Sequence, residues 1–391
     1  MLKDKKIIFL INHVSFFISH RLPIALRAIE EGCYVELITG KAGSETMEKE
    51  ALKTLKKYDI KHTRVSFESS GLNIFRETKS LIELYKLLKA KEPDILHMAS
   101  PKAVTYGGII SNFLTIPGLV FSISGLGFIF TKTKKNSLFR DSIKLIFRIF
   151  SRFIIDRNKN IKIIVQNSDD LNFFIEKKIG KPSQVLLIKG SGVDLNDFAD
   201  ISFEEKDKII VFPARVILDK GIREFILAAN KLKPIHPDWD FLVAGAYDYK
   251  NPTSISFKEI QNLVSNNSVK FLGHVNNVNE LFRRSSIVCL PSYREGMPKA
   301  ILEAQAAGCA IVTTDVVGCR ESIERDKTGY LVSPYNINEL IEALEKLISN
   351  KKKREDFGSL GIEFAKKNFD LNVVLDKVMG TYELLLKKKF E

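Results

Sequence analysis

The stretch Lys208–Lys233, KIIVFPARVILDKGIREFILAANKLK, contains the pattern on which the predicted fold rests. Its first part, Lys208–Phe212, is an almost unbroken apolar run, which is typical of a strand buried on both faces. A turn with Pro213 and Gly221 follows, and the amphipathic segment Ile222–Lys233 is predicted to be a helix. A strand, a loop and a helix in this order form the unit of a parallel α/β sheet.

The same unit recurs along the 391 residues. In the first half we predict strands at Lys6–Ile11, Tyr34–Thr39, Lys61–Val65, Asp94–His97, Leu119–Ser124, Lys162–Gln166 and Val185–Ile188. In the second half we predict them at Lys208–Phe212, Asp240–Ala244, Val269–Leu272, Ile287–Leu290 and Ala310–Thr313. Helices are predicted between them, including Ser19–Glu31 and Ile74–Lys89. The fold class is therefore α/β, with two Rossmann-like, doubly wound parallel sheets.

A chain of this length is expected to form two domains. Periodic pattern gives way to turn and acidic residues near Asp194–Lys206. We therefore predict an N-terminal domain at 1–200, a C-terminal domain at 201–370, and a helix at 371–391 that packs back across the junction. Ligands bind outside the carboxyl ends of such strands, so we expect the two sheets to face one interdomain cleft.

Charge is distributed unevenly. Residues 1–194 hold 32 Lys and Arg against 19 Asp and Glu, and residues 195–391 hold 28 of each, so the first half carries the entire net charge of +13. This half is predicted to meet an anionic partner. An apolar fraction of 45% excludes a disordered chain. The four cysteines form no C-x-x-C pair, which argues against zinc or disulfides and favours the cytoplasm.

Two apolar stretches could be mistaken for membrane signals. Lys6–Ile11 is interrupted by Asn12 and His13, so we interpret it as a strand rather than a signal peptide. The 29 residues between Lys102 and Lys132 carry no charge, which is long enough to span a bilayer. Pro117 and Gly118 divide this run, and a helix at Lys102–Leu114 followed by a strand at Leu119–Ser124 explains it better.

Candidate catalytic residues follow two strands of the second half. Arg215 and Lys220 lie between a strand end and a helix start, where a guanidinium and an ammonium can clamp a diphosphate. Glu295 lies in the loop after Ile287–Leu290, and Glu303 follows eight residues later, about 12 Å along a helix axis. Gly296 and Pro298 suit the start of that helix, whose amides can bind an anion.

These two segments resemble the motifs of the family 4 glycosyltransferases, a retaining group with the GT-B fold of two facing Rossmann-like sheets. The E-x7-E element matches Glu295 and Glu303, and the R-x4-K element matches Arg215 and Lys220. Similarity extends over nearly the whole chain and includes GSGVD at Gly190–Asp194 and FLGH at Phe271–His274.

The resemblance implies the following roles. Arg215 and Lys220 bind the donor diphosphate and stabilise the leaving charge, and Glu303 binds the ribose. Glu295 holds the donor sugar together with the backbone at Gly296, Met297 and Pro298, and His274 lies beside the base. The donor is expected to be a UDP-sugar, and its phosphate takes the acceptor proton. No metal, cofactor or protein nucleophile is then required.

The N-terminal motif FFISHRLP at Phe16–Pro23, with Gly125-Leu-Gly127, resembles a bacterial subgroup that extends glycans on polyprenyl-diphosphate carriers in O-antigen, capsule and glycoprotein pathways. This chain lacks the histidine that many members carry after the fifth strand. The candidate acceptor or cleft residues are instead His20, Arg21, His97, Ser124 and Gly125.

A basic segment between Lys132 and Lys162 contains ten Lys and Arg against Asp141 and Asp156, together with many Phe. Four of the cations recur every fourth residue and would share one face of a helix. They are Arg140, Lys144, Arg148 and Arg152. We predict that they contact an anionic inner-membrane surface and hold the enzyme peripherally on its cytoplasmic side.

Other functions remain as alternatives. A sugar-nucleotide 2-epimerase on a similar fold would need further acids, which the sequence does not place. A glycoside hydrolase needs two carboxyls about 5–9.5 Å apart across the scissile bond, which the helical spacing of Glu295 and Glu303 does not favour. A basic protein that binds membrane or nucleic acid without catalysis would leave the E-x7-E element unexplained, and the chain lacks interleaved aromatic platforms.

Overall fold

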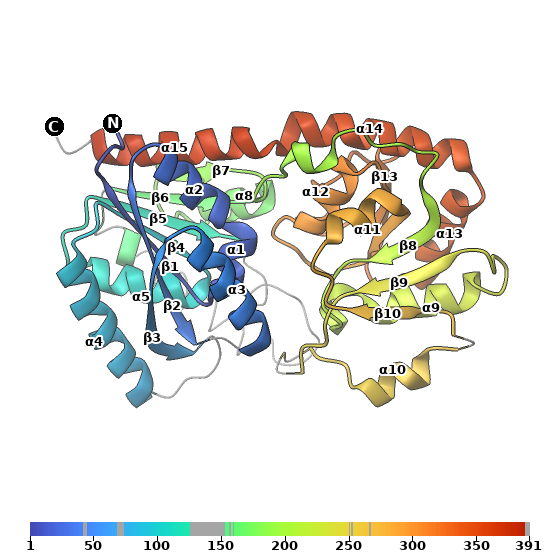
Figure 1. Ribbon diagram of the computed structural model, residues 1–391, viewed down its shortest axis with the longest axis horizontal. Coiled ribbons are helices and arrows are strands. Elements are labelled where there is room, and N and C mark those ends of the chain that lie inside the picture. Colours follow the sequence, from blue (N-terminus) through green and yellow to red (C-terminus); the bar gives the residue numbers. More distant parts are fainter. Residues whose placement is uncertain are drawn as a thin grey trace. The chain divides into compact units, whose positions relative to one another are not determined.

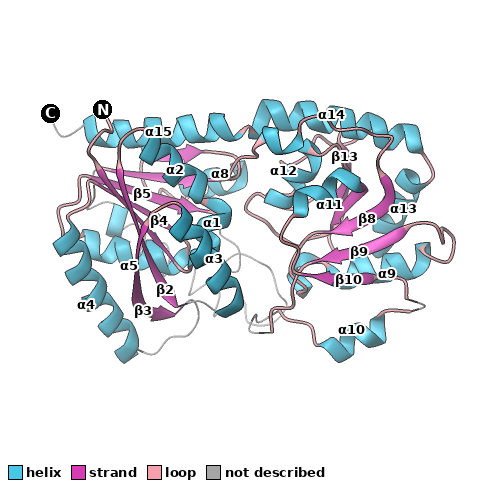
Figure 2. Cartoon of the chain, viewed as in Figure 1, coloured by secondary structure: helices cyan, strands magenta, loops and turns pink. Residues whose placement is uncertain are grey.

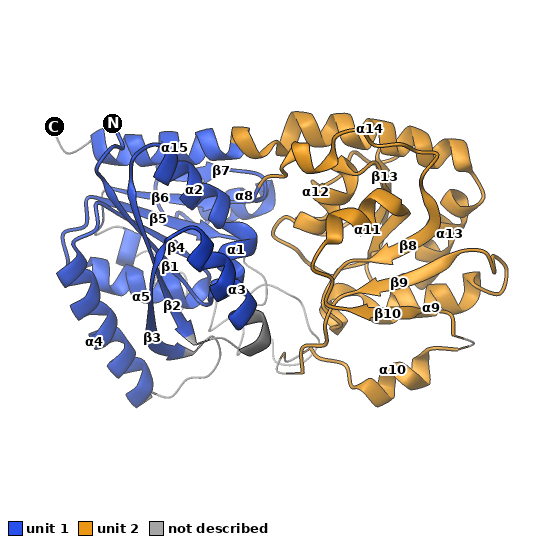
Figure 3. Ribbon diagram, viewed as in Figure 1, with its two compact units in different colours: residues 1–191, 374–391 blue, residues 192–373 orange. Residues whose placement is uncertain are grey.

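The computed structural model describes residues 1–41, 45–68, 74–125, 153–155, 158, 160–249, 251, 253–265 and 267–387. The chain divides into two compact units (Figure 3). Unit 1 consists of Met1–Ser191 together with Val374–Glu391, and unit 2 consists of Gly192–Val373. The end of the chain therefore belongs to the first unit.

Unit 1 contains a seven-stranded parallel sheet in the order β3-β2-β1-β4-β5-β6-β7 (Figure 1). Its strands are β1 (Lys6–Ile11), β2 (Tyr34–Lys41), β3 (Lys61–Glu68), β4 (Ile95–Ala99), β5 (Gly118–Ile123), β6 (Ile161–Val165) and β7 (Val185–Leu187). Its helices are α1 (Val14–His20), α2 (Leu22–Glu30), α3 (Glu45–Lys57), α4 (Ile74–Lys91), α5 (Pro101–Ser111), α8 (Ser168–Glu176), the 3-10 turn η1 (Pro182–Gln184) and most of α15 (Leu371–Lys387).

Unit 2 contains a six-stranded parallel sheet in the order β10-β9-β8-β11-β12-β13 (Figure 2). Its strands are β8 (Asp207–Phe212), β9 (Asp240–Ala244), β10 (Lys270–Gly273), β11 (Ser285–Leu290), β12 (Ala310–Thr314) and β13 (Gly329–Val332). Its helices are α9 (Ile222–Leu232), α10 (Phe257–Leu263), α11 (Val278–Arg284), α12 (Lys299–Ala306), α13 (Ile337–Ile348) and α14 (Lys351–Phe369), with 3-10 turns η2 (Leu195–Phe198) and η3 (Leu218–Lys220).

The predicted class of two doubly wound parallel sheets is confirmed. The central strands are continuous apolar runs because helices cover both of their faces, and in β1 and β11 almost every residue is buried. In the uncharged stretch after Lys102, the helix α5 and the strand β5 replace a single long span. No helix in the described part of the chain has the length and apolar character to cross a bilayer.

The structure corrects two local predictions. The helix predicted at Ser19–Glu31 is two helices, because Arg21 leaves helical geometry at φ −130° and Pro23 has no amide with which to continue the helix. Strand β13, at Gly329–Val332, was not predicted. Gly329 permits the pairing, because a Cβ there would lie 2.4 Å from the Ile311 carbonyl oxygen.

The strand order of each sheet reverses at one place. In unit 2 this switch point lies between β8 and β11, and in unit 1 it lies between β1 and β4. Loops at the carboxyl ends of the two central strands diverge there and leave room for a ligand. In unit 2 the loop after β8 carries Arg215, and the loop after β11 carries Glu295.

Candidate active site

Lys220 and Glu295 form an ion pair at the switch point of unit 2. The Lys220 Nζ atom lies 2.5 Å from Glu295 Oε1, and the two side chains are only 21% and 11% exposed. Lys220 ends η3, and Gly221 follows in the left-handed region at φ +76°. A Cβ at Gly221 would lie 2.1 Å from the Pro291 carbonyl oxygen, so only glycine lets Lys220 approach the loop after β11 so closely.

Backbone contacts fix the loop that carries Glu295. The Glu295 amide donates to the Val317 carbonyl at 3.1 Å, and the Tyr293 amide donates to the Asp219 carbonyl at 2.9 Å. Gly318, at φ +80°, allows a similarly close approach, because a Cβ there would lie 2.5 Å from the carbonyl oxygens of both Glu295 and Gly296. The loops after β8, β11 and β12 therefore meet around Glu295 and are held in one arrangement.

Buried contacts support the same loop from beneath. The Tyr293 hydroxyl donates to Glu224 Oε1 at 2.7 Å, and Glu224 is a buried residue in the first turn of α9. Burial, followed by this hydrogen bond and the Glu224 charge, raises the pKa of Tyr293 far above its ordinary value. Tyr293 therefore stays protonated and continues to donate. This pair was not predicted, since its only signal in the sequence is an acid in the first turn of the helix that follows Lys220.

Arg215 is more exposed than Lys220. Its side chain is 55% exposed, and its Nη1 atom lies 2.6 Å from Asp248 Oδ2. Asp248 follows β9 and was not predicted as a site residue. An ion pair this exposed contributes at most about 1 kcal/mol, so an incoming anion can displace the carboxylate at little cost.

The remaining predicted donor residues follow the strands nearby. Glu303 is largely buried on α12, where its Oε1 atom lies 3.0 Å from Lys299 Nζ. Glu295 lies before α12, which begins at Lys299 after the extended N-cap Pro298, so helical spacing does not set the separation of Glu295 and Glu303. Met297 and Pro298 are buried, whereas His274 is exposed directly after β10.

Two further acidic residues of unit 2, Asp238 and Asp240, are paired with lysines. Asp238 pairs with Lys208 at 2.5 Å and Asp240 with Lys270 at 3.0 Å. Within the described residues, no group of three or more His, Cys, Asp or Glu could hold a metal ion. The four cysteines are unpaired and buried.

The carboxyl edge of unit 1 has a different character. His97, in β4, is completely buried and lies between the Tyr382 hydroxyl, 2.5 Å from Nδ1, and the Ser122 hydroxyl, 2.7 Å from Nε2. Burial, with the Arg21 charge as a smaller cause, lowers the pKa of His97 well below its ordinary value. The structure therefore places His97 inside unit 1, as a neutral contact to α15, and not at a surface open to an acceptor.

Arg21, His20 and Ser124 do come together. The buried Arg21 guanidinium donates from Nη1 to the His20 carbonyl at 2.9 Å and from Nη2 to the Ser124 hydroxyl at 3.2 Å. Burial lowers the Arg21 pKa to about 10, so the group keeps its charge at neutral pH. Gly125 follows at φ +116°, a conformation that suits only glycine.

The basic residues predicted to contact a membrane are not among those that the structure describes. Arg140, Lys144, Arg148 and Arg152 lie outside the described residues, as does Gly127.

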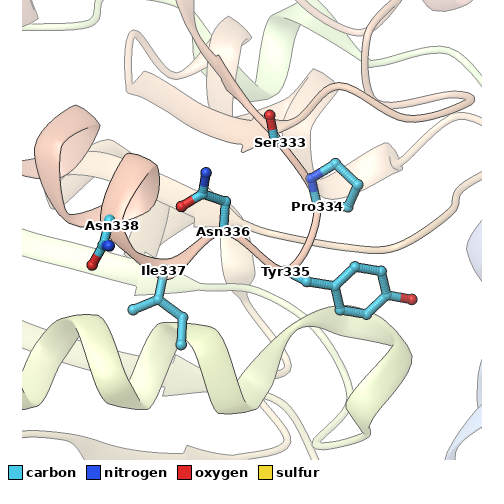
Figure 4. A pocket seen from close by; sticks show the side chains of 6 residues that line it. All are labelled: Ser333, Pro334, Tyr335, Asn336, Ile337 and Asn338. Atoms are coloured by element: carbon cyan, nitrogen blue, oxygen red, sulfur yellow. The ribbon is translucent and has the colours of Figure 1, made fainter.

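A hollow of about 460 Å³ lies where β13 leads into α13, and it is lined by Ser333–Asn338 (Figure 4). None of the predicted site residues lines this hollow. The Tyr335 ring, which points away from Asn338 in Figure 4, lies 4.0 Å from the Tyr293 ring.

Comparison with known proteins agrees with this geometry. Residues 193–364 match the family described as "Glycosyl transferases group 1", and residues 6–158 match "Glycosyl transferase 4-like". Among solved structures, a glycosyltransferase from Rickettsia africae is 20% identical with a TM-score of 0.74, covering 98% of this chain and 99% of that one. Anabaena Alr3699/HepE, solved with UDP and glucose, is 18% identical with a TM-score of 0.74, covering 97% and 99%.

Two parallel α/β sheets and the likeness to these solved glycosyltransferases show that the chain has the GT-B fold. It is a glycosyltransferase that combines a "Glycosyl transferase 4-like" domain in its first half with a "Glycosyl transferases group 1" domain in its second half.

Two curated relatives are similar over most of their length. "N,N'-diacetylbacillosaminyl-diphospho-undecaprenol alpha-1,3-N-acetylgalactosaminyltransferase" of Campylobacter jejuni is 27% identical over 82% of this chain and 85% of its own. "UDP-Gal:alpha-D-GlcNAc-diphosphoundecaprenol alpha-1,3-galactosyltransferase" of Escherichia coli is 26% identical over 72% and 73%.

Proposed function

We propose that this glycosyltransferase moves a hexosyl or N-acetylhexosaminyl group from a UDP-sugar to a saccharide linked to polyprenyl diphosphate. The observation that supports the proposal most strongly is the placement of Arg215 and Lys220 at the switch point of unit 2. The names of both curated relatives, which contain undecaprenol-linked acceptors, support the acceptor class. The UDP complexes of a structural neighbour agree with the donor class.

In the proposed reaction the acceptor oxygen bonds to the anomeric carbon while the bond from that carbon to the donor phosphate breaks. The acceptor proton passes to a phosphate oxygen, and UDP leaves with the electron pair. Arg215 and Lys220 stabilise the charge that develops on the diphosphate, which is electrostatic catalysis by preorganised cations. Glu295 would hold the sugar near Lys220, and Glu303 would bind the ribose.

We further propose that the reaction retains anomeric configuration and needs no metal. Both relatives are named for an α-1,3 linkage, and an α-linked product from an α-configured UDP-sugar is retention. Two cations at the candidate diphosphate site can supply the charge compensation that a divalent ion would otherwise give. Since its acceptor is lipid-linked, the enzyme would work at an anionic membrane surface, and the basic first half suits that location.

The test is a transfer assay with the purified chain, a panel of UDP-sugars and two synthetic acceptors, diphosphoundecaprenol carrying either diacetylbacillosamine or GlcNAc. We expect one donor and acceptor pair to give an α-linked product at full rate in excess EDTA. A β-linked product would contradict retention, and loss of activity in EDTA that is restored by a divalent ion would contradict metal independence. Hydrolysis or epimerisation of the donor without transfer would contradict the proposed function itself.

A further inference from the structure

A stack of aromatic rings lies at the carboxyl ends of β9 and β10. The rings of Tyr247 and Tyr249 are nearly parallel, with 5.6 Å between their centroids and an interplanar angle of 5°. Phe271, in β10, lies on Tyr247 at 6.2 Å and 20°. Tyr249 at the end of the stack remains 66% exposed. Rings of this size are usually covered, and an exposed ring at the end of a stack favours a ligand with an apolar face.

Backbone contacts hold this stack beside Arg215. A Cβ at Gly245 would lie 1.8 Å from the Ala214 carbonyl oxygen, so the loops after β8 and β9 touch there. The Val216 amide donates to the Ala246 carbonyl at 3.0 Å. Asp248, between the two tyrosines, pairs with Arg215 at 2.6 Å. The aromatic rings and the candidate diphosphate site are therefore parts of one rigid surface.

The Arg215 guanidinium beside the rings indicates which planar ligand fits this surface. A nucleoside diphosphate joins an anionic end to a planar base through one ribose, and here a guanidinium and an aromatic stack lie on adjoining loops. The stack also reaches β10, whose carboxyl end lies at the same edge of the parallel sheet as those of β8 and β9. A sugar ring could also lie on a tyrosine, but a sugar alone would not explain the adjacent cation.

We propose that Tyr249, backed by Tyr247 and Phe271, stacks on the base of the donor nucleotide whose diphosphate binds Arg215 and Lys220. The inference rests on the proposed function, since it assumes a nucleotide donor. Stacking of a base on an aromatic side chain strengthens binding about 5- to 150-fold and hardly depends on the base. Tyr249 therefore supplies affinity for the nucleoside, whereas the choice of uracil depends on other groups.

The experiment compares two ligands, UDP and inorganic pyrophosphate, which has the charge but no base. We expect Tyr249→Ala to weaken UDP binding about tenfold in calorimetric titration and to leave pyrophosphate binding unchanged. Tyr249→Phe should bind UDP like the wild type, whereas Tyr249→Leu, which keeps bulk but not the ring, should resemble the alanine variant. Tyr34→Ala is the matched control, because Tyr34 is 62% exposed and lies at the amino end of β2.

The outcomes separate this inference from the function on which it rests. If the wild type binds UDP and Tyr249→Ala binds it equally well, the stacking inference alone is overturned. Equal losses for UDP and pyrophosphate also overturn it, because the ring would then act through the phosphate site. Unchanged UDP binding with a raised KM for the acceptor would assign the ring to the acceptor saccharide instead. A wild-type chain that binds no UDP contradicts both proposals.

Discussion

The carboxyl edges of the two sheets carry different polar chemistry on the same architecture. In unit 2 the side chains are charged, and Arg215 and Lys220 each contact a carboxylate that an anionic ligand could replace. In unit 1 the polar groups around His97 are buried, and they satisfy one another through the hydroxyls of Tyr382 and Ser122. The difference teaches that the charged edge of unit 2 suits our proposed anion site, whereas the buried polar groups of unit 1 contact α15 near the end of the chain.

The largest expected effect is on transfer in unit 2. Lys220→Ala should lower the transfer rate 10²–10³-fold, because it removes a cation held against the developing charge of the diphosphate. The measurement is kcat/KM under donor-limited conditions. Lys208→Ala is the control, since Lys208 also forms a 2.5 Å ion pair but lies near the amino end of β8 and is 56% exposed. Similar rates for both variants would remove Lys220 from the site.

The next effect is on stability in unit 1. His97→Ala should lower the free energy of unfolding by about 2–3 kcal/mol, because two buried hydroxyls lose their partner and a ring stacked on Phe9 is lost. Urea denaturation measures the loss. The folded variant should bind UDP as the wild type does. Weak UDP binding with unchanged stability would reverse the distinction between the two edges.

The depressed pKa of His97 predicts how that stability depends on pH. The unfolded chain has an ordinary histidine pKa of about 6.5, whereas burial keeps folded His97 neutral well below that value. Below about pH 6.5 the unfolded state therefore binds one more proton, and the free energy of unfolding falls by up to about 1.4 kcal/mol per pH unit. The free energy of unfolding of the wild type should then exceed that of His97→Gln by less at pH 5 than at pH 7.5. Parallel curves would show that His97 is not held neutral.

The smallest effect concerns the charge beside Arg215. Asp248→Asn should strengthen pyrophosphate binding about two- to fivefold, because the exposed carboxylate competes with the ligand for the guanidinium. Titration calorimetry at low ionic strength resolves a change of this size. Adding 0.5 M salt should reduce the gain, since screening weakens exposed pairs. Weaker binding by the variant would mean that Asp248 orients Arg215 for the ligand instead of competing with it.

Much of the fold was predictable because buried parallel strands are continuous apolar runs. Lys6–Ile11 and Asp240–Ala244 are strands with the predicted bounds. Strand β13 was missed because its four residues follow turn signals and pair only through a close approach at Gly329. The break at Arg21 was missed because Pro23 is also compatible with the first turn of a helix.

The site was partly predictable, for a related reason. Arg215, Lys220 and Glu295 follow strands directly, so their place at a sheet edge could be derived from the sequence. The contacts of Arg215 with Asp248 and of Tyr293 with Glu224 could not, because each joins residues 33 or 69 positions apart that only the packed sheet brings close. His97 was predicted as a cleft residue and is instead buried. Its position near a strand end suggested an exposed ligand contact, but Tyr382, 285 residues later, contacts and buries it.

The central claim is that the second sheet binds an activated sugar through its diphosphate. A crystal structure with UDP tests it most directly. The account predicts phosphate oxygens within hydrogen-bonding distance of the Arg215 guanidinium and Lys220 Nζ, with Asp248 and Glu295 turned away from those cations. A diphosphate bound elsewhere, with both ion pairs intact, would contradict it.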